Sequence, residues 1–193
     1  MYSKREIRII GIDDGFFIKH KHRKTILVGA IMRGAHQLDG VLSTRITIDG
    51  WDVTDKIIKM IKKSSHYYQL RIIMLNGITF AGFNVVDLEK LYKTLELPVI
   101  VVIRKKPDLS EFKKALMHLD DWKDRWNLIE KLEEPKPVDT KYGTTYYQKI
   151  GISDDDAKDI IKRTAINSRI PEPVRVAHLI AMGVTRGYSR GKV

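Results

Sequence analysis

The sequence Ile7-Arg8-Ile9-Ile10-Gly11-Ile12 is an apolar, mostly β-branched run that stops abruptly at Asp13-Asp14-Gly15. Such a run predicts a buried strand that delivers acidic side chains to its C-terminal end. Carboxylates placed at a strand end are suitable ligands for a hard metal ion. The alternative is a simple turn, because Asp-Gly also favours hairpins, and this stretch alone leaves both interpretations open.

Composition limits the classes of protein that remain. The chain has 193 residues, 43% of them hydrophobic, which suits a single domain over residues 1–193 with a core of its own. It has no cysteine, so disulfides, zinc–thiolate sites and thiol nucleophiles are excluded. No apolar segment has the length of a membrane span and no signal-peptide pattern precedes the first strand. We therefore expect a cytoplasmic protein with no membrane partner.

The charge of the chain favours a polyanionic partner. Its formal net charge is +11, and lysine and arginine gain from the release of counterions at phosphates. An alternative is the charge enrichment of thermophile proteins, since 31% of the residues are charged. The basic residues are clustered, however, at residues 19–24, at Arg104-Lys105-Lys106 and from Arg186 to Lys192. This clustering favours nucleic acid.

The order of periodic segments predicts an α/β fold. Helical periodicity is found at residues 53–63 and 86–95. Further strands are expected at residues 25–33, 41–48, 70–75 and 98–103. Strands that alternate with helices favour parallel pairing. We expect a mixed sheet flanked by helices, with the first three strands antiparallel and the fourth and fifth parallel to the first.

The second half of the chain predicts mostly helices. They are expected at residues 111–119, 121–132 and 154–167 and after Pro171. Residues 133–137 contain two prolines and two glutamates, which predicts a break in the structure. Residues 146–150 predict a short strand at an edge of the sheet.

Three groups resemble functional motifs but have a commoner structural explanation. The acids at residues 154–156 follow Ser153 and suit the first turn of a helix better than a metal site. The histidines of the loop 19–24 stand among cations that oppose a metal ion, so a solvated loop is favoured. Trp122 and Trp126 are four residues apart, which is more typical of a core stripe than of a base-stacking platform.

A histidine lies on the apolar side of the last predicted helix. His178 shares that side with Val174, Ala177 and Ala181. A lone histidine on an apolar helix face is usually part of the core. It becomes a functional candidate if this face of the helix looks at Asp13.

At these motifs the sequence resembles endonuclease V and, over nearly its whole length, the archaeal endonuclease dU family. Gly11-Ile12-Asp13 resembles the context in which an Asp ends the first strand of endonuclease V. The family's carboxylate near the start of the first helix corresponds best to Asp52, with Asp49 as the competing alignment. The string from Pro171 to His178, which matches Pro-Glu-Pro-x-Arg-x-Ala-Asp/His, is the most specific resemblance.

The fourth-strand motif of endonuclease V resembles Asn76-Gly77 and the glycine-containing loop, helix and Pro98 strand that follow, up to Lys105-Lys106. Endonuclease V has Asp where this chain has Asn76. Its Pro-containing wedge, which separates the strands of DNA, is absent from the corresponding residues 47–51.

The resemblance implies a ribonuclease H-like, endonuclease V-like fold and divalent-metal-dependent cleavage of nucleic acid beside a deaminated base, deoxyuridine or hypoxanthine. DNA is the implied partner, with RNA as an alternative, and Mg²⁺ is the implied cofactor, with Mn²⁺ as an alternative. The implied metal ligands are Asp13, Asp52 and Asn76, and His178 completes the catalytic set. The implied substrate-binding residues are Gly77, Thr79, Gly82, Lys105, Lys106 and Arg175.

The asparagine leaves a second class of function open. An amide oxygen can ligate a cation, but the site loses one formal negative charge at Asn76. The alternative is a non-catalytic nucleic-acid-binding relative with a vestigial metal site. Whether Asp14 substitutes for a missing ligand also stays open.

Overall fold

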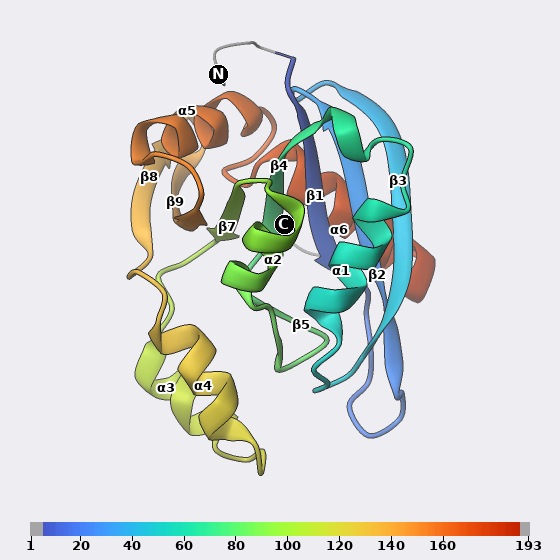
Figure 1. Cartoon of the computed structure of the whole chain (residues 1–193), viewed down its shortest axis with the longest axis vertical. Coiled ribbons are helices and arrows are strands. Elements are labelled where there is room, and N and C mark those ends of the chain that lie inside the picture. Colours follow the sequence, from blue (N-terminus) through green and yellow to red (C-terminus); the bar gives the residue numbers. More distant parts are fainter. Residues whose placement is uncertain (1–5, 190–193) are drawn as a thin grey trace.

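A mixed sheet of seven strands forms the centre of the computed structural model, which describes residues 6–189 (Figure 1). The strand order across this sheet is β3-β2-β1-β4-β7-β9-β8. The strands are β1 (Arg8–Asp14), β2 (Lys24–Arg33), β3 (Gln37–Thr47), β4 (Leu70–Asn76), β7 (Val99–Ile103), β8 (Lys136–Thr140) and β9 (Gly143–Ile150). A separate small hairpin pairs β5 (Thr79–Phe80) with β6 (Asn84–Val85).

The pairing of the strands confirms the predicted topology. β1, β2 and β3 are antiparallel neighbours, whereas β4 is parallel to β1 and β7 is parallel to β4. In the register of the parallel strands, Ile12 lies beside Leu75, and Asn76 lies beside Val102. The next positions along β1 and β4, Asp13 and Asn76, therefore reach the same edge of the sheet.

Helices cover both faces of the sheet. The helices are α1 (Val53–Lys62), α2 (Leu88–Leu95), α3 (Leu109–Leu116), α4 (Trp122–Glu130), α5 (Asp154–Thr164) and α6 (Glu172–Arg186), with a 3₁₀ turn, η1, at Tyr67–Gln69. α1 and α2 pack on the face that holds Ile10 and Ile12, and α5 and α6 pack on the opposite face. The α3–α4 pair extends from one end of the sheet (Figure 1). The central strands are apolar throughout because both of their faces are covered.

Gly11 allows α6 to approach β1 closely. A Cβ atom at this position would lie 2.0 Å from the backbone carbonyl carbon of Pro173, at the start of α6. Only glycine permits such contact between two backbones. The contact fixes α6 across the face of β1 on which Asp13 also points.

The structure corrects two predictions about the end of the sheet. The predicted break at residues 133–137 runs into the strand β8, which forms the edge of the sheet. Pro137 is tolerated there because an edge strand does not need every backbone N–H for pairing. The strand predicted at residues 146–150 belongs to β9, which lies between β7 and β8, so its assignment to the edge was wrong.

Smaller features agree with the predicted structural roles. The Ser153 side chain accepts a hydrogen bond from the Asp156 N–H, so it caps α5 as expected, although α5 ends at Thr164. Trp122 and Trp126 pack against the apolar cluster between α3 and α4. Among the helices of residues 6–189, none is long and apolar enough to cross a membrane.

Candidate active site

A cavity of about 270 Å³ opens where β1 and β4 end. The residues that line it are Asp13, Asp14, Gly15, Phe16, Phe17, Asn76, His178 and Met182. Three of the four predicted catalytic residues, Asp13, Asn76 and His178, thus meet in one place. Asp14, whose role the sequence left open, joins them.

Asp13 and His178 form a close pair. His178 Nδ1 lies 2.7 Å from Asp13 Oδ2, and Asp13 is only 3% exposed. The hydrogen bond to Asp13 raises the pKa of His178 above its usual value, against the opposing effect of burial. The carboxylate therefore favours an imidazolium whose other nitrogen, Nε2, carries a second proton. The apolar side of α6 does look at Asp13, which was the condition for a functional role of this histidine.

Asp14 points to the other face of the sheet, toward the β5–β6 hairpin. Its Oδ2 accepts a hydrogen bond of 2.6 Å from the Ala81 N–H. Burial and the neighbouring charge of Asp13 raise the pKa of Asp14 to about 7. The buried carboxylate of Asp13 and the half-buried one of Asp14 are neighbours and repel each other, and a cation between them would relieve that repulsion.

The oxygen atoms at this cavity fit a magnesium ion. Two carboxylates, from Asp13 and Asp14, and the amide oxygen of Asn76 are hard ligands, and Mg²⁺ usually takes one or two protein carboxylates together with water and substrate phosphate. In the part of the chain that the structure describes, no group of three or more His, Cys, Asp or Glu residues could hold a metal by itself. Binding would therefore depend on Asn76 and on oxygen atoms that the substrate supplies.

Asp52, the predicted third ligand, does not line this cavity. Its Oδ1 accepts hydrogen bonds from the Thr47 N–H and the Asn84 side chain, and its Oδ2 accepts one from the Thr47 hydroxyl. These bonds lower the pKa of Asp52 against the effect of burial. Asp52 stands at the N-cap position of α1 without a side-chain capping bond, and Asn84 accepts from the Val53 N–H instead. Metal ligation by Asp52 stays a prediction that would require this carboxylate to leave its three donors.

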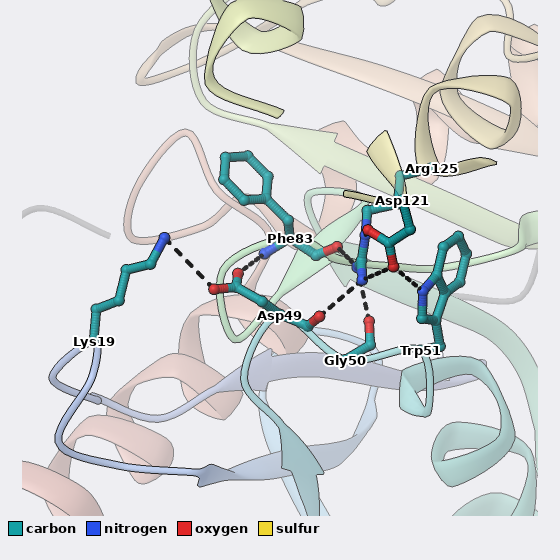
Figure 2. A network of polar contacts seen from close by, with 7 residues as sticks. All are labelled: Lys19, Asp49, Gly50, Trp51, Phe83, Asp121 and Arg125. Atoms are coloured by element: carbon teal, nitrogen blue, oxygen red, sulfur yellow. Dashed lines mark hydrogen bonds and ion pairs between the residues drawn. The ribbon is translucent and has the colours of Figure 1, made fainter. Parts of the chain in front are cut away.

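Asp49, the competing candidate, contacts the same hairpin as Asp14. Its Oδ1 accepts a hydrogen bond from the Phe83 N–H at 2.8 Å, and its Oδ2 lies 3.6 Å from Lys19 Nζ (Figure 2). A Cβ atom on Gly82 would lie 2.2 Å from Asp49 Oδ1, and Gly82 has φ +87°. Gly82 is therefore explained by the close approach of Asp49, and it lines neither the cavity nor the pocket beside it.

A buried arginine holds the Asp49 turn in place, and sequence reasoning missed it. Arg125 on α4 is 2% exposed and donates hydrogen bonds to the backbone carbonyls of Asp49, Gly50 and Phe83 (Figure 2). It also forms a two-pronged ion pair with Asp121, at 2.7 Å for each prong. Its position among the charged residues of α4 gave no signal of burial, because all its main partners lie on other segments or one helical turn away.

A second pocket, of about 400 Å³, lies beside the cavity. The predicted substrate residues Gly77 and Thr79 line it, and Asn76, the residue before Gly77, lines the first cavity. The end of β4 thus separates the two hollows. The first part of the glycine-containing loop, Gly77 to Thr79, therefore forms part of the wall of this pocket.

The basic residues predicted to contact the substrate differ in their accessibility. Lys105 and Lys106 are exposed just after β7, beside Ile103 and Pro107, which line the second pocket. Arg175 instead forms a bidentate ion pair with the buried Glu172, at 2.7 Å for each contact, so its guanidinium is already engaged.

The other basic clusters lie on the surface of the described chain. Residues 19–24 are exposed, as expected for a solvated loop. Arg186 stacks on the rings of Phe16 and Tyr188, at 4.9 and 5.1 Å. The last part of the C-terminal cluster, residues 190–192, lies outside the described residues.

Comparison with known proteins identifies the family. A family model described as endonuclease dU matches residues 5–185. The chain belongs to the endonuclease dU family. Archaeal relatives of this family member include a UPF0215 protein of Nanoarchaeum equitans, 52% identical over 96% of the chain and 92% of the relative, and one of Methanothermobacter thermautotrophicus, 49% identical over 97% and 92%.

Solved structures confirm the fold. A protein of unknown function from Archaeoglobus fulgidus superposes with a TM-score of 0.85 and 37% identity, over 94% of this chain and all of that one. Ciona intestinalis endonuclease V, solved in complex with a DNA that contains inosine, has a TM-score of 0.60 and 12% identity over 95% of this chain and 85% of that one. The likeness to endonuclease V and to Argonaute shows a ribonuclease H-like fold. Membership of the family and this fold support a nuclease.

Proposed function

We propose that the protein is a Mg²⁺-dependent endonuclease that cleaves DNA beside a deaminated base. The observation that carries this proposal is the meeting of Asp13, Asp14, Asn76 and His178 in one cavity at the ends of two parallel strands. Nucleic acid as the partner is supported by the net charge of +11 and by the DNA complex of the structurally similar endonuclease V.

Each residue of the cavity has a distinct task in this proposal. Asp13, Asp14 and Asn76 would hold the ion. When bound, the ion supplies an activated water and neutralises charge on the scissile phosphate. His178, held by Asp13 at Nδ1, directs Nε2 away from that carboxylate and can donate its proton to a phosphate oxygen. Asp14 takes the place of the carboxylate that Asn76 lacks.

The second pocket would take the base. An enzyme that acts beside a damaged base must move that base out of the stack. The pocket begins one residue after Asn76, so a base in it and a phosphate at the cavity would belong to neighbouring parts of one strand. Lys105 and Lys106 at the rim are available to the flanking phosphates.

A nicking assay tests the proposal. Oligonucleotides with one uracil or one hypoxanthine should be cut with Mg²⁺ or Mn²⁺ by the wild type. Asp13→Ala should lose cleavage and retain binding, because the carboxylate serves the ion whereas lysine and arginine serve the phosphates. Asn76→Asp should tighten Mg²⁺ binding, since a hard cation prefers an anionic oxygen.

The asparagine at position 76 supports a second candidate function, because the site has one formal negative charge less. If neither the wild type nor Asn76→Asp nicks a deaminated substrate with either ion, while salt-sensitive binding persists, the chain is a non-catalytic nucleic-acid-binding member of its family.

A further inference from the structure

The pocket beside the cavity has the shape and chemistry of a site for a neutral ring. Its volume of about 400 Å³ lies in the ordinary range for small-ligand sites. Its walls come from the β4–β5 loop, the end of β7, the α3–α4 pair, the segment before β8 and β9. The apolar lining residues are Ile78, Ile103, Leu109, Phe112, Trp126, Ile129 and Leu132.

The residues that line the pocket disfavour a phosphate inside it. Among the described residues that line it there is no lysine or arginine, whereas Glu130, Glu133 and Glu134 stand at its edge and are exposed. Carboxylates at a rim repel a phosphate group and leave an uncharged heterocycle unaffected. The pocket therefore suits a base, with its phosphates held outside.

One buried amide inside the pocket has a fixed orientation. Gln148 on β9 is 8% exposed, and its Nε2 donates a hydrogen bond of 2.7 Å to the Glu133 carbonyl. Because a carbonyl accepts only from a donor, this bond decides which end of the amide is nitrogen. In the described part of the chain, Gln148 Oε1 accepts no hydrogen bond. The free acceptor of Gln148 therefore remains for a ligand in the pocket that this side chain lines.

We propose that Gln148 is the residue that distinguishes a deaminated base from its parent, and this inference rests on the proposed function above. Deamination converts cytosine to uracil and adenine to hypoxanthine. In each case a ring nitrogen changes from an acceptor to an N–H donor. Gln148 Oε1 accepts a hydrogen bond from that N–H, whereas the lone pair of cytosine N3 or adenine N1 would face it unfavourably. One acceptor thus recognises both deaminated bases.

The test compares Gln148→Leu with the wild type on oligonucleotides that differ at one base. Binding of the uracil and hypoxanthine strands should weaken about 10- to 100-fold, the usual cost of leaving a buried hydrogen-bonding group unpaired. Cytosine and adenine strands should hardly change, so the uracil:cytosine and hypoxanthine:adenine preferences collapse. Thymine and guanine carry the same ring N–H, so the uracil:thymine and hypoxanthine:guanine preferences should stay as they are.

The control variant makes the same side-chain change outside the pocket. Gln69→Leu alters an exposed glutamine of η1 and should leave every preference unchanged. An equal loss on all bases in Gln148→Leu would mean a merely structural role and would overturn the inference. The same holds if that variant keeps the wild-type preference for uracil over cytosine.

A modified substrate tests the inference without any mutation. N3-methyluracil has lost the N–H, so the wild type should bind it as weakly as Gln148→Leu binds uracil. Equal wild-type binding of uracil and N3-methyluracil would overturn the role of Gln148 while leaving the nuclease proposal standing. A wild type with no preference for uracil over cytosine or for hypoxanthine over adenine would instead refute the proposed substrate itself.

Discussion

Asp14→Asn should change how the stability of the protein depends on pH. Burial and the charge of Asp13 raise the pKa of Asp14 from 3.8 to about 7 in the folded state. The folded protein therefore holds a proton on Asp14 between these two values that the unfolded chain has released. In this window the free energy of unfolding falls as the pH rises, because the folded state binds more protons. Asparagine resembles the neutral carboxyl group and should remove this dependence.

The size of the effect follows from the two pKa values. Between pH 5 and pH 8, proton linkage predicts that the wild type loses about 2–3 kcal/mol of unfolding free energy through this one group. The Asp14→Asn variant should lack that loss. The free energy of unfolding of this variant, measured relative to that of the wild type, should therefore rise by about 2–3 kcal/mol between pH 5 and pH 8.

Urea unfolding at the two pH values measures this difference. Asp120→Asn, the same change at an exposed aspartate, is the control and should follow the wild type. Adding Mg²⁺ at pH 8 should stabilise the wild type more than Asp14→Asn, because an ion that binds the folded state alone favours it. Parallel pH profiles for the wild type and Asp14→Asn would show that burial and the charge of Asp13 do not raise the pKa of Asp14.

Two further variants test the surroundings of the site. Arg125→Leu should lower the free energy of unfolding by about 3–5 kcal/mol, because it strands buried carbonyls and a carboxylate, and a loss below about 1 kcal/mol in urea unfolding would contradict this. The bond to Asp13 raises the pKa of His178 above 6.5, its value in the unfolded chain. The stabilisation from this bond is therefore complete below pH 6.5 and disappears as the pH rises through the raised pKa. His178→Gln should lose this stabilisation. Its deficit against the wild type should therefore be larger at pH 5 than at pH 9, and an equal deficit at both would rule out the Asp13 bond as its source.

Most of the sheet could be predicted because its strands carry their signal locally. β1 and β7 are apolar on both sides, and the parallel pairing follows from the helices between strands. β8 was missed because the glutamates and prolines of residues 133–137 suggest a break, whereas an edge strand tolerates a proline such as Pro137. Which strand lies at the edge depends on long-range pairing, and no local pattern specifies that.

The candidate site, too, could be predicted only in part from the sequence. Asp13 and Asn76 come together because each ends a strand and the strands are parallel neighbours, which sequence can suggest. The direction of the Asp52 carboxylate depends on Thr47 and Asn84, and Asn84 lies 32 positions further along the chain. Local sequence places Asp52 at a helix start and cannot say that its oxygens are already occupied.

Arg125 shows why the two hollows cannot be understood separately. Its guanidinium joins α4, which forms one wall of the second pocket, to the carbonyls of Asp49 and Phe83. Those residues hold the hairpin whose Ala81 N–H bonds to Asp14 in the cavity. A chain of direct contacts therefore runs from the wall of the pocket to one carboxylate of the candidate metal site. The buried guanidinium of Arg125, which stabilises the contact of α4, thus also helps to fix the position of the Asp14 side chain.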